Sequence, residues 1–349
     1  MKFKKKIANI ITVILVTLLI ISVMFMTLYR HQIATLRSVN KIDDYPIYTM
    51  DYEGTYWFDD FMNTEGMTEN FNGFFNQKLS HGFIRSSFAN NSESSGFCTC
   101  FVCENENGDI LFCRNMESTS VPYPSIVVTT HDGTYATVGT AFLTDRPEGT
   151  FGFMRDMLTE PYFIGDGMNE AGLAISILTV PAAIVPQNDG TPLLGAEQIC
   201  RLILNEAGTV EEAVALFDEF TMRVSMTQQL SFCHFFIADR SGAAVVVELH
   251  DGIVDVIEPI HDNYMTVTNF YLSSDTLSGS GQTRYNTVEA VLEESGGVMS
   301  EHDAFELLGT LDDPFIHPEW TCVYNLTTGE MSIMPNGQLD HIHEIDYSF

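Results

Sequence analysis

Three side chains that could form a nucleophilic site lie on one predicted β-hairpin. A first strand runs through Cys98-Thr99-Cys100-Phe101, a polar turn covers residues 104–109, and a second apolar strand ends at Arg114 and Glu117. Arg114 and Glu117 follow Cys98 by 16 and 19 residues, so a two-stranded return brings both back near the thiol. A guanidinium beside a thiol favours the thiolate, which is the nucleophilic form of cysteine. The hairpin therefore predicts a cysteine nucleophile with an arginine and a carboxylate beside it.

This nucleophile gains a base of its own if the Phe97–Cys98 bond is cut and Cys98 begins a mature chain. A free α-amine has a pKa of about 8 and a thiol of about 8.5, so proton transfer between them is nearly balanced at neutral pH. The amine can take the thiol proton, the thiolate can attack an amide carbonyl, and the amine can protonate the departing nitrogen before water hydrolyses the thioester. Taken alone, a cysteine such as Cys98 is more commonly a small apolar residue buried in a strand. The alternative for Arg114 and Glu117 is a surface ion pair.

The hairpin resembles the start of the choloylglycine hydrolase and penicillin V acylase family, which includes acid ceramidase. These linear amide C–N hydrolases use an N-terminal nucleophile (Ntn), and their mature chains begin Cys-Thr or Cys-Ser and carry Arg-Asn-x-Asp on the next strand. The corresponding residues here are Cys98, Arg114 and Glu117, so a glutamate replaces the family's aspartate. The resemblance runs from Pro46 to Asn336 and is loose over residues 182–224. It implies that the arginine sits beside the thiol and that the carboxylate orients the amine.

The same resemblance implies three further site residues. Gly167-Met168-Asn169-Glu170-Ala171-Gly172-Leu173-Ala174 matches a family block, and the family's substrate-facing residue lies ten positions past its asparagine, at Thr179. Thr268-Asn269 matches the family's Thr-Asn, whose asparagine supplies an oxyanion-hole amide worth about 10²–10³ in rate. Arg284 matches a second arginine that supports the nucleophile. Without the resemblance, Asn269 is a strand-ending residue in a turn and Arg284 a surface residue at a helix start.

The elements that must position these residues alternate between strands and helix pairs. Beyond the first hairpin, strands are predicted over Ser125–Thr130, Tyr135–Phe142, Asn169–Ile177, Gln229–Asp239, Ala243–Leu249, Ile253–Ile257, Met265–Asn269, Trp320–Asn325 and Met331–Met334. Helices are predicted over Ala196–Asn205, Thr209–Phe217, Arg284–Glu294 and Glu301–Leu308, with Thr209 and Ser300 as caps. Periodicity indicates one α+β domain after residue 98. The resemblance implies a four-layer αββα Ntn-hydrolase sandwich.

The N-terminus predicts a transmembrane helix. Four lysines among the first six residues precede Ile7–Tyr29, which has no charged side chain and is long enough to span a bilayer. The lysines favour a cytoplasmic N-terminus, which places the rest of the chain outside. A cleaved signal peptide is the alternative. The length of the apolar run and the lack of a clear small-x-small cleavage site favour an uncleaved anchor over residues 1–30.

Residues 31–97 separate this helix from the nucleophile. We expect 31–46 to be a polar stalk and the aromatic-rich segment 47–97 to form short helices packed on the main domain. Ser87–Ser95 would be an exposed approach to the cut. The prediction therefore has three parts: residues 1–30 as cytoplasmic lysines and anchor, 31–97 as stalk and pro-segment, and 98–349 as the catalytic domain.

The charge lies almost entirely in the last part. Residues 1–97 hold nine basic and nine acidic residues, whereas 98–349 hold seven arginines, no lysine and 38 acidic residues, which gives the net charge of −31. Such a surface repels phosphate backbones, so nucleic-acid binding is excluded. Cys100 and Cys103 form one Cys-x-x-Cys without a second ligand pair at a zinc-like spacing, so no metal ion or other cofactor is expected. The pairing of the seven cysteines stays open.

The sequence thus predicts an exported, membrane-tethered amidase that acts on small-molecule amides. Its substrates would be N-acyl amines or N-acyl amino acids, as for bile-salt hydrolases or penicillin V acylases. The catalytic domain would be extracellular, or released after processing. Acyl transfer from the same thioester and a catalytically inactive, ligand-binding relative are the alternatives. A homo-oligomer is left open.

Overall fold

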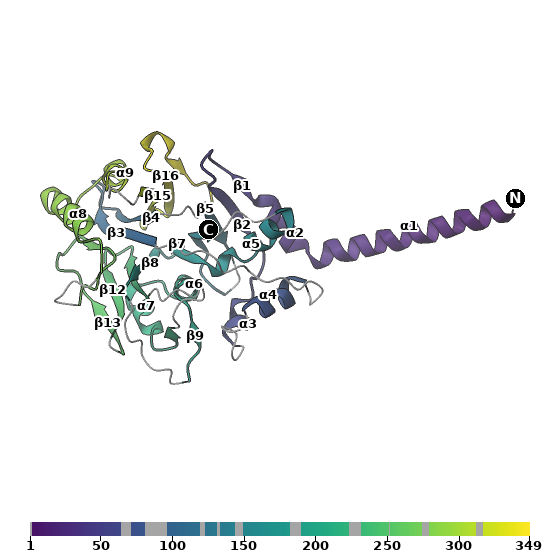
Figure 1. Cartoon of the computed structure of the whole chain (residues 1–349), viewed down its shortest axis with the longest axis horizontal. Coiled ribbons are helices and arrows are strands. Elements are labelled where there is room, and N and C mark those ends of the chain that lie inside the picture. Colours follow the sequence, from purple (N-terminus) through teal and green to yellow (C-terminus); the bar gives the residue numbers. More distant parts are fainter. Residues whose placement is uncertain are drawn as a thin grey trace.

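A computed structural model of the chain describes residues 2–63, 71–80, 96–118, 123–130, 133–143, 149–181, 190–222, 232–250, 252–273, 279–311 and 317–349. Two β-sheets and the helices packed on them form the body of the molecule. Helix α1 (Lys2–Leu28) extends away from this body as a rod (Figure 1).

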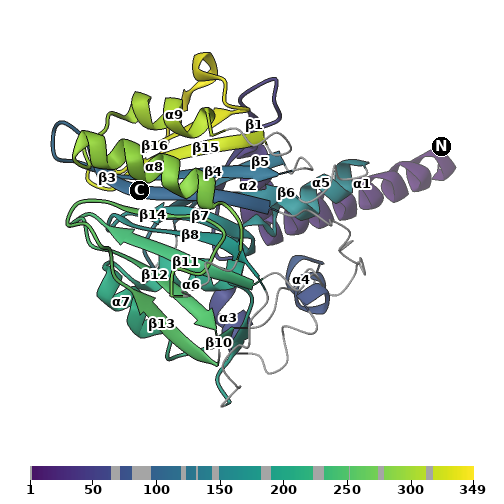
Figure 2. The same ribbon diagram turned by 60° about the vertical axis from the view of Figure 1, so that its left-hand side comes forward.

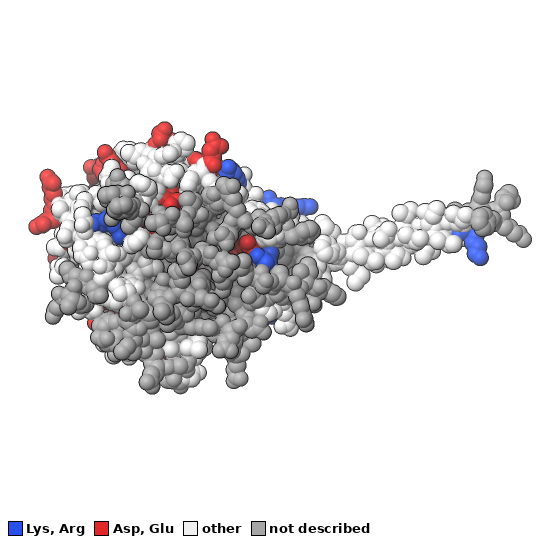
Figure 3. Space-filling view, viewed as in Figure 1, with Lys and Arg blue, Asp and Glu red and all other residues white. Residues whose placement is uncertain are grey.

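The rod is apolar along its length. Its segment Lys5–Leu28 has a mean hydropathy of 2.8 and none of it is buried in the body. A helix of 24 residues rises about 36 Å, which exceeds the hydrocarbon core of a bilayer of about 30 Å. Figure 3 shows the rod free of charged atoms between its two ends, with lysine near the outer end. Within the described residues it is the one helix with the length and composition to cross a membrane, and a signal sequence would share both properties.

The larger sheet has nine strands in the order β1-β2-β5-β6-β7-β8-β11-β12-β13. The strands are β1 (Asn40–Lys41), β2 (Tyr48–Tyr52), β5 (Tyr123–Thr129), β6 (Thr137–Leu143), β7 (Ile164–Asn169), β8 (Leu173–Val180), β11 (Phe232–Asp239), β12 (Ala244–His250) and β13 (Ile253–Ile257). Neighbouring strands are antiparallel, except that β2 and β5 run parallel.

The smaller sheet has six antiparallel strands in the order β14-β3-β4-β15-β16-β17. The strands are β3 (Gly96–Glu104), β4 (Ile110–Ser118), β14 (Met265–Val267), β15 (His317–Asn325), β16 (Glu330–Pro335) and β17 (His343–Glu344). A separate parallel pair joins β9 (Leu193–Leu194) to β10 (Thr221–Met222).

Helices lie beside both sheets. They are α2 (Arg30–Ser38), α3 (Phe58–Met62), α4 (Phe71–Ser80), α5 (Gly149–Met157), α6 (Ala196–Glu206), α7 (Val210–Leu216), α8 (Gln282–Ser295) and α9 (Glu301–Gly309), with short 3₁₀ turns η2 (Glu160–Tyr162) and η3 (Leu339–His341). Figure 2 shows α8 and α9 along the smaller sheet and α6 and α7 along the larger one. The predicted mixture of helices and strands is confirmed.

Three apolar clusters hold these elements together. One contains Ile199 of α6 and Ile175 of β8, so it joins the helices to the larger sheet. A second fills the space between the sheets, where the rings of Phe112 (β4) and Phe236 (β11) stack with centroids 5.1 Å apart. The third contains Phe305 of α9 and residues of the smaller sheet. Burial of these faces is the main source of stability.

The segment 31–46 is not the polar stalk that the sequence predicts. This segment contains α2 and β1, and both contact the region of β2. Strand β1 pairs with β2, and the buried Thr35 of α2 accepts a 2.9 Å hydrogen bond from the amide of Glu53, which follows β2. Strand β2 was not expected either. Its alternate residues Met50 and Tyr52 are buried in the same apolar cluster as Ile199 and Ile175. This burial fixes the strand in the larger sheet. Strands from both sides of Cys98 therefore share one sheet.

The aromatic residues of the upstream segment pack as predicted. Tyr56, Phe58, Phe61 and Phe75 surround the ring of Tyr162, with centroid distances between 4.6 and 6.0 Å. Such contacts bury large apolar areas. The short helices expected between residues 47 and 97 are present as α3 and α4, whereas Tyr48–Tyr52 at the start of this segment forms strand β2. The predicted approach Ser87–Ser95 lies outside the described residues.

Helix starts follow the predicted caps. Thr209 Oγ1 accepts from the Glu212 amide at 3.2 Å, and Ser300 Oγ accepts from the Asp303 amide at 3.1 Å. Two boundaries differ in ways that matter for the site. Helix α8 begins at Gln282, which places Arg284 in its first turn, and β14 ends at Val267, so Asn269 lies beyond the strand.

Candidate active site

The register of the β3–β4 hairpin sets which way each candidate side chain points. Cys98 lies opposite Met116, Cys100 opposite Arg114, and Phe97 opposite Glu117. Since side chains alternate between the faces of a sheet, Cys98 and Arg114 share the face toward the larger sheet. Glu117 lies on the other face.

The Cys98 thiol is enclosed between the sheets. The residue is only 3% exposed, and its Sγ lies 3.5 Å from Arg114 Nη2 and 3.9 Å from Met116 Sδ. Burial raises the pKa of Cys98 to about 11, although the charge of Arg114 acts in the opposite direction. With the Phe97–Cys98 bond intact, the group is therefore a neutral thiol at neutral pH.

Arg114 has a buried counter-ion that the sequence did not reveal. Its Nε lies 2.8 Å from Asp166 Oδ2, and both side chains are at most 1% exposed. Thr140 Oγ1 and Tyr324 Oη each donate a 2.5 Å bond to the Asp166 carboxylate, one to each oxygen. Arg114 is thus held between the sheets, and its interpretation as half of a surface ion pair is wrong.

Asn269 and Arg284 hold the peptide unit at Cys98. The Cys98 amide donates to Asn269 Oδ1 at 2.8 Å, and Arg284 Nη2 donates to the same oxygen at 2.9 Å. Arg284 Nη1 donates to the Cys98 carbonyl at 2.8 Å, and the guanidinium lies 6.0 Å from the centre of the Phe97 ring. Arg284 is buried, so its interpretation as a surface residue is also wrong.

Glu117 pairs with Arg284 rather than with Arg114. Its Oε1 lies 3.0 Å from Arg284 Nη1 and accepts bonds from Thr99 Oγ1 at 2.8 Å and Asn115 Nδ2 at 3.1 Å. Its Oε2 is buried and has no hydrogen-bond partner among the described residues. Glu117 Oε2 can therefore accept a further hydrogen bond.

Thr179 lies at the site through Asn269. Asn269 Nδ2 donates to the Thr179 carbonyl at 2.9 Å and to Thr179 Oγ1 at 3.2 Å. The structure therefore brings all six predicted residues into one contact network. Arg114, Asn269 and Arg284 contact Cys98 directly, Glu117 is joined through Arg284, and Thr179 is joined through Asn269.

The block around Asn169 that resembles the family positions two strands, and its contacts lie on α6 and not at the thiol. Asn169 Nδ2 donates to the carbonyls of Leu204 and Ala207 at 3.0 and 2.7 Å, and its Oδ1 accepts from the amides of Ala171 and Leu173. These bonds tie α6 to the turn between β7 and β8. They fix the two strands that carry Asp166 and Thr179.

Sequence reasoning missed Asp166, Thr99 and Asn115. Two of these had a local signal, because Thr99 follows the nucleophile and Asn115 follows Arg114. For Asp166 the signal is weaker: it is an acidic residue between Gly165 and Gly167 in an otherwise apolar stretch. A buried charge requires a partner, so this residue should have been matched to an arginine.

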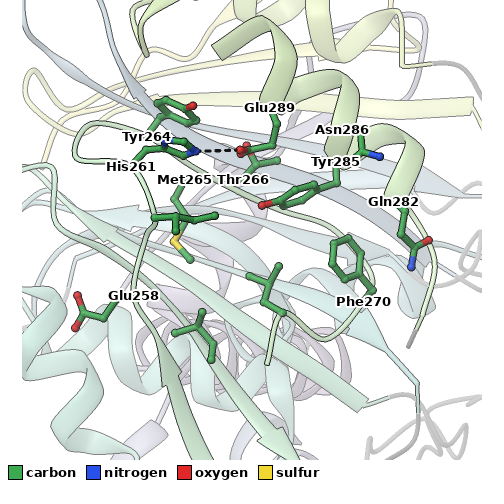
Figure 4. Close-up of a pocket in the computed structure, with 13 residues that line it drawn as sticks. Glu258, His261, Tyr264, Met265, Thr266, Phe270, Gln282, Tyr285, Asn286 and Glu289 are labelled. Carbon is green, nitrogen blue, oxygen red and sulfur yellow. Dashed lines mark ion pairs between the residues drawn. The ribbon is translucent and has the colours of Figure 1, made fainter. Parts of the chain in front are cut away.

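An apolar cavity of about 360 Å³ lies beyond Asn269, between α8 and the end of β13. Figure 4 shows Phe270 at one end and the His261–Glu289 ion pair at the other, with a nitrogen–oxygen distance of 3.5 Å. The hydroxyl of Thr266 on its wall is buried without a partner in the described part of the chain. None of the six predicted site residues lines it.

Comparisons with known proteins identify a matching family and solved structures of similar fold. Residues 98–271 match the family model described as linear amide C-N hydrolases, choloylglycine hydrolase family. Two solved structures of variants of the conjugated bile acid hydrolase from Clostridium perfringens are similar in fold. Both are 16% identical to this chain, and they have TM-scores of 0.51 and 0.52. The matches cover 72% and 71% of this chain, and 97% and 92% of those chains.

A penicillin V acylase from Agrobacterium tumefaciens is 20% identical, with a TM-score of 0.47 and coverage of 68% of this chain and 83% of that chain. No curated protein sequence matches the chain.

Proposed function

Through residues 98–271 the chain belongs to the choloylglycine hydrolase family of linear amide C–N hydrolases, and from this premise we propose that Cys98 is its nucleophile. The substrates would be N-acyl amines or N-acyl amino acids, and the Phe97–Cys98 bond would be cut first. The observation that carries the proposal is the convergence of Arg114, Asn269 and Arg284 on Cys98 at hydrogen-bond distances.

The first step is a cleavage of the chain by its own thiol. Cys98 Sγ attacks the Phe97 carbonyl carbon, the C–N bond breaks, and the nitrogen takes up the thiol proton. Water then hydrolyses the thioester, which restores the thiol and leaves a carboxylate at Phe97 and an α-amine at Cys98. Two hydrogen bonds support this step, one from the Cys98 amide to Asn269 and one from Arg284 to the Cys98 carbonyl. They fix the peptide groups on both sides of the Cys98 α-carbon.

Turnover would then use the new amine as the base. Arg114 stabilises the thiolate that attacks the substrate carbonyl, and the amide C–N bond breaks as the departing amine takes its proton from the Cys98 ammonium. Water then hydrolyses the acyl thioester, which releases the acid and restores the thiol. Asn269 Nδ2 is the donor for the oxyanion, with the longer bond to Thr179 Oγ1 given up to the substrate oxygen. The role of Glu117 is to orient the amine, and that of Arg284 is to hold Glu117 and Asn269 in place.

We also infer the organisation of the mature protein. Two sheets with helices on their outer faces support a four-layer αββα arrangement. Residues 98–349 would be the mature catalytic chain, and 1–97 would stay attached because β2 lies inside the larger sheet. Helix α1 would be an uncleaved anchor, with the catalytic part outside the membrane.

The test combines maturation and activity. The full chain is purified in detergent beside a Cys98→Ala variant, and both are examined by intact mass and N-terminal sequencing. A fragment beginning at Cys98 in the wild type and absent from the variant is the expected result. Release of free amine from a conjugated bile acid or penicillin V, by the wild type alone, would then identify the first substrate class. An uncut wild-type chain would refute the mechanism.

A further inference from the structure

A second cluster of chemically active side chains lies at the edge of the molecule, away from the thiol. His341 Nδ1 lies 3.1 Å and His343 Nε2 lies 2.6 Å from one oxygen of Asp43, its Oδ2. The three ligand atoms all lie within 4.8 Å of one another. Among the described residues this is the one group of three or more histidine, cysteine or acidic side chains whose atoms converge in this way.

The spacing is close to that of a metal-binding triad. Zinc bonds imidazole nitrogen and carboxylate oxygen at about 2.0–2.1 Å, so ligand atoms in a tetrahedral site lie about 3.3 Å apart. The two nitrogen–oxygen distances of 3.1 and 2.6 Å need only a small opening of the triad to accept an ion. Two imidazoles and one carboxylate suit zinc, whereas magnesium and calcium prefer oxygen ligands alone.

The backbone around the triad is already fixed. The Asp43 side chain is only 6% exposed, and its other oxygen, Oδ1, accepts the Tyr45 amide at 2.8 Å, which leaves Oδ2 directed at the histidines. His343 lies on β17, which pairs with β16. Orientation of a ligand by a second hydrogen bond is a regular feature of metal sites. The imidazole of His341 is 42% exposed, so an ion can reach the triad from solvent.

We propose that Asp43, His341 and His343 bind one zinc ion, with water as the fourth ligand. The triad joins two distant parts of the chain, since Asp43 precedes β2 whereas both histidines lie near the C-terminus. The ion therefore fastens the upstream segment to the smaller sheet. The site does not depend on cleavage before Cys98. If the chain is cut there, the same ion links the two resulting fragments.

The experiment uses the full chain in detergent, stripped with EDTA and titrated with zinc chloride. Calorimetry is expected to give one zinc per chain, with a rise in Tm that magnesium and calcium do not produce. His341→Ala and His343→Ala should each weaken zinc binding by at least about tenfold. His302→Ala, which removes an exposed histidine on α9, is the matched control and should bind zinc like the wild type.

A readout on the unaltered protein covers the case in which a variant fails to fold. Cobalt(II) added to the stripped wild-type chain should give the visible absorption of a tetrahedral site, and zinc should abolish it. The proposal is overturned if the stripped chain binds no zinc, which would make the triad a purely hydrogen-bonded contact. It is also overturned if both histidine variants, correctly folded, bind zinc as the wild type does.

Discussion

Replacing Asp166 with asparagine tests whether this carboxylate balances the charge of Arg114 beside the thiol. The two side chains form a 2.8 Å ion pair and are almost completely buried. Asparagine has nearly the same shape, and its side chain can keep a bond to Thr140 or Tyr324. The substitution therefore removes one buried negative charge and little else.

The expected cost follows from the burial of the pair. Removing one partner of a buried ion pair destabilises a protein by about 3–5 kcal/mol. The entropy of unfolding is about 2.1 cal/mol/K per residue, so a chain of 349 residues has about 0.7 kcal/mol/K. The Tm of the Asp166→Asn variant should therefore fall by roughly 4–7 °C. The pKa of Cys98 should also fall, because Asp166 is one of the groups that raise it.

Two measurements check this, both on the full chain in detergent. Thermal unfolding gives the change in Tm, and the rate of iodoacetamide alkylation against pH, followed by mass on the uncut fraction, gives the pKa of Cys98. Asp218→Asn is the matched control, since Asp218 is exposed and its loss should shift the Tm by less than about 1 °C. If Asp166→Asn behaves like this control and its alkylation profile matches the wild type, Asp166 does not balance Arg114.

Three further predictions concern the nucleophile, the oxyanion donor and the upstream segment. In the uncut wild-type chain, alkylation of Cys98 should accelerate about tenfold per pH unit until the pH reaches its pKa of about 11; a plateau near pH 8 would contradict the burial of the thiol. Asn269→Ala should lower kcat about 10²–10³-fold with a small change in KM, measured by steady-state release of amine; an unchanged kcat would remove Asn269 from the oxyanion site. Phe75→Ala should cost about 3–5 kcal/mol, because Phe75 is buried against Tyr162, and should lower the Tm by roughly 4–7 °C in thermal unfolding. An unchanged Tm would show that the aromatic cluster does not stabilise the upstream segment.

The sequence located the hairpin because its turn is short and its strands are apolar. Once the turn is fixed, the antiparallel return brings Met116 opposite Cys98 and Arg114 opposite Cys100, so Arg114 lies close to Cys98 on the same face. The register also explains what the sequence missed. Arg114 lies two residues before Met116, the cross-strand partner of Cys98, so Arg114 and Cys98 share one face of the sheet. Glu117 is the residue after Met116, so its side chain points to the opposite face, where it contacts Arg284.

Contacts between distant elements could not be predicted in this way. Asp166 meets Arg114 only because the two sheets pack face to face, and no periodicity in a single strand reports that packing. Strand β2 is only five residues long, so its pattern of apolar residues does not distinguish it from a loop. Its parallel partner β5 lies more than seventy residues later, so no local turn signals the pairing. The contacts between Asp43 and the two histidines span 298 and 300 residues.

The same contacts serve both steps of the proposed chemistry, and this bears on the glutamate that replaces the family's aspartate. In the uncut chain, Glu117 lies opposite Phe97, and only one of its oxygens is paired, with Arg284 and its neighbours. A buried carboxylate oxygen without a donor costs free energy. Cleavage would break the Phe97–Cys98 peptide bond and create an ammonium group on Cys98, the residue that follows Phe97 on β3. The longer side chain of Glu117 could then keep Arg284 on one oxygen and accept the ammonium on the other, so the substitution suits a site that completes its hydrogen bonds only after the cut.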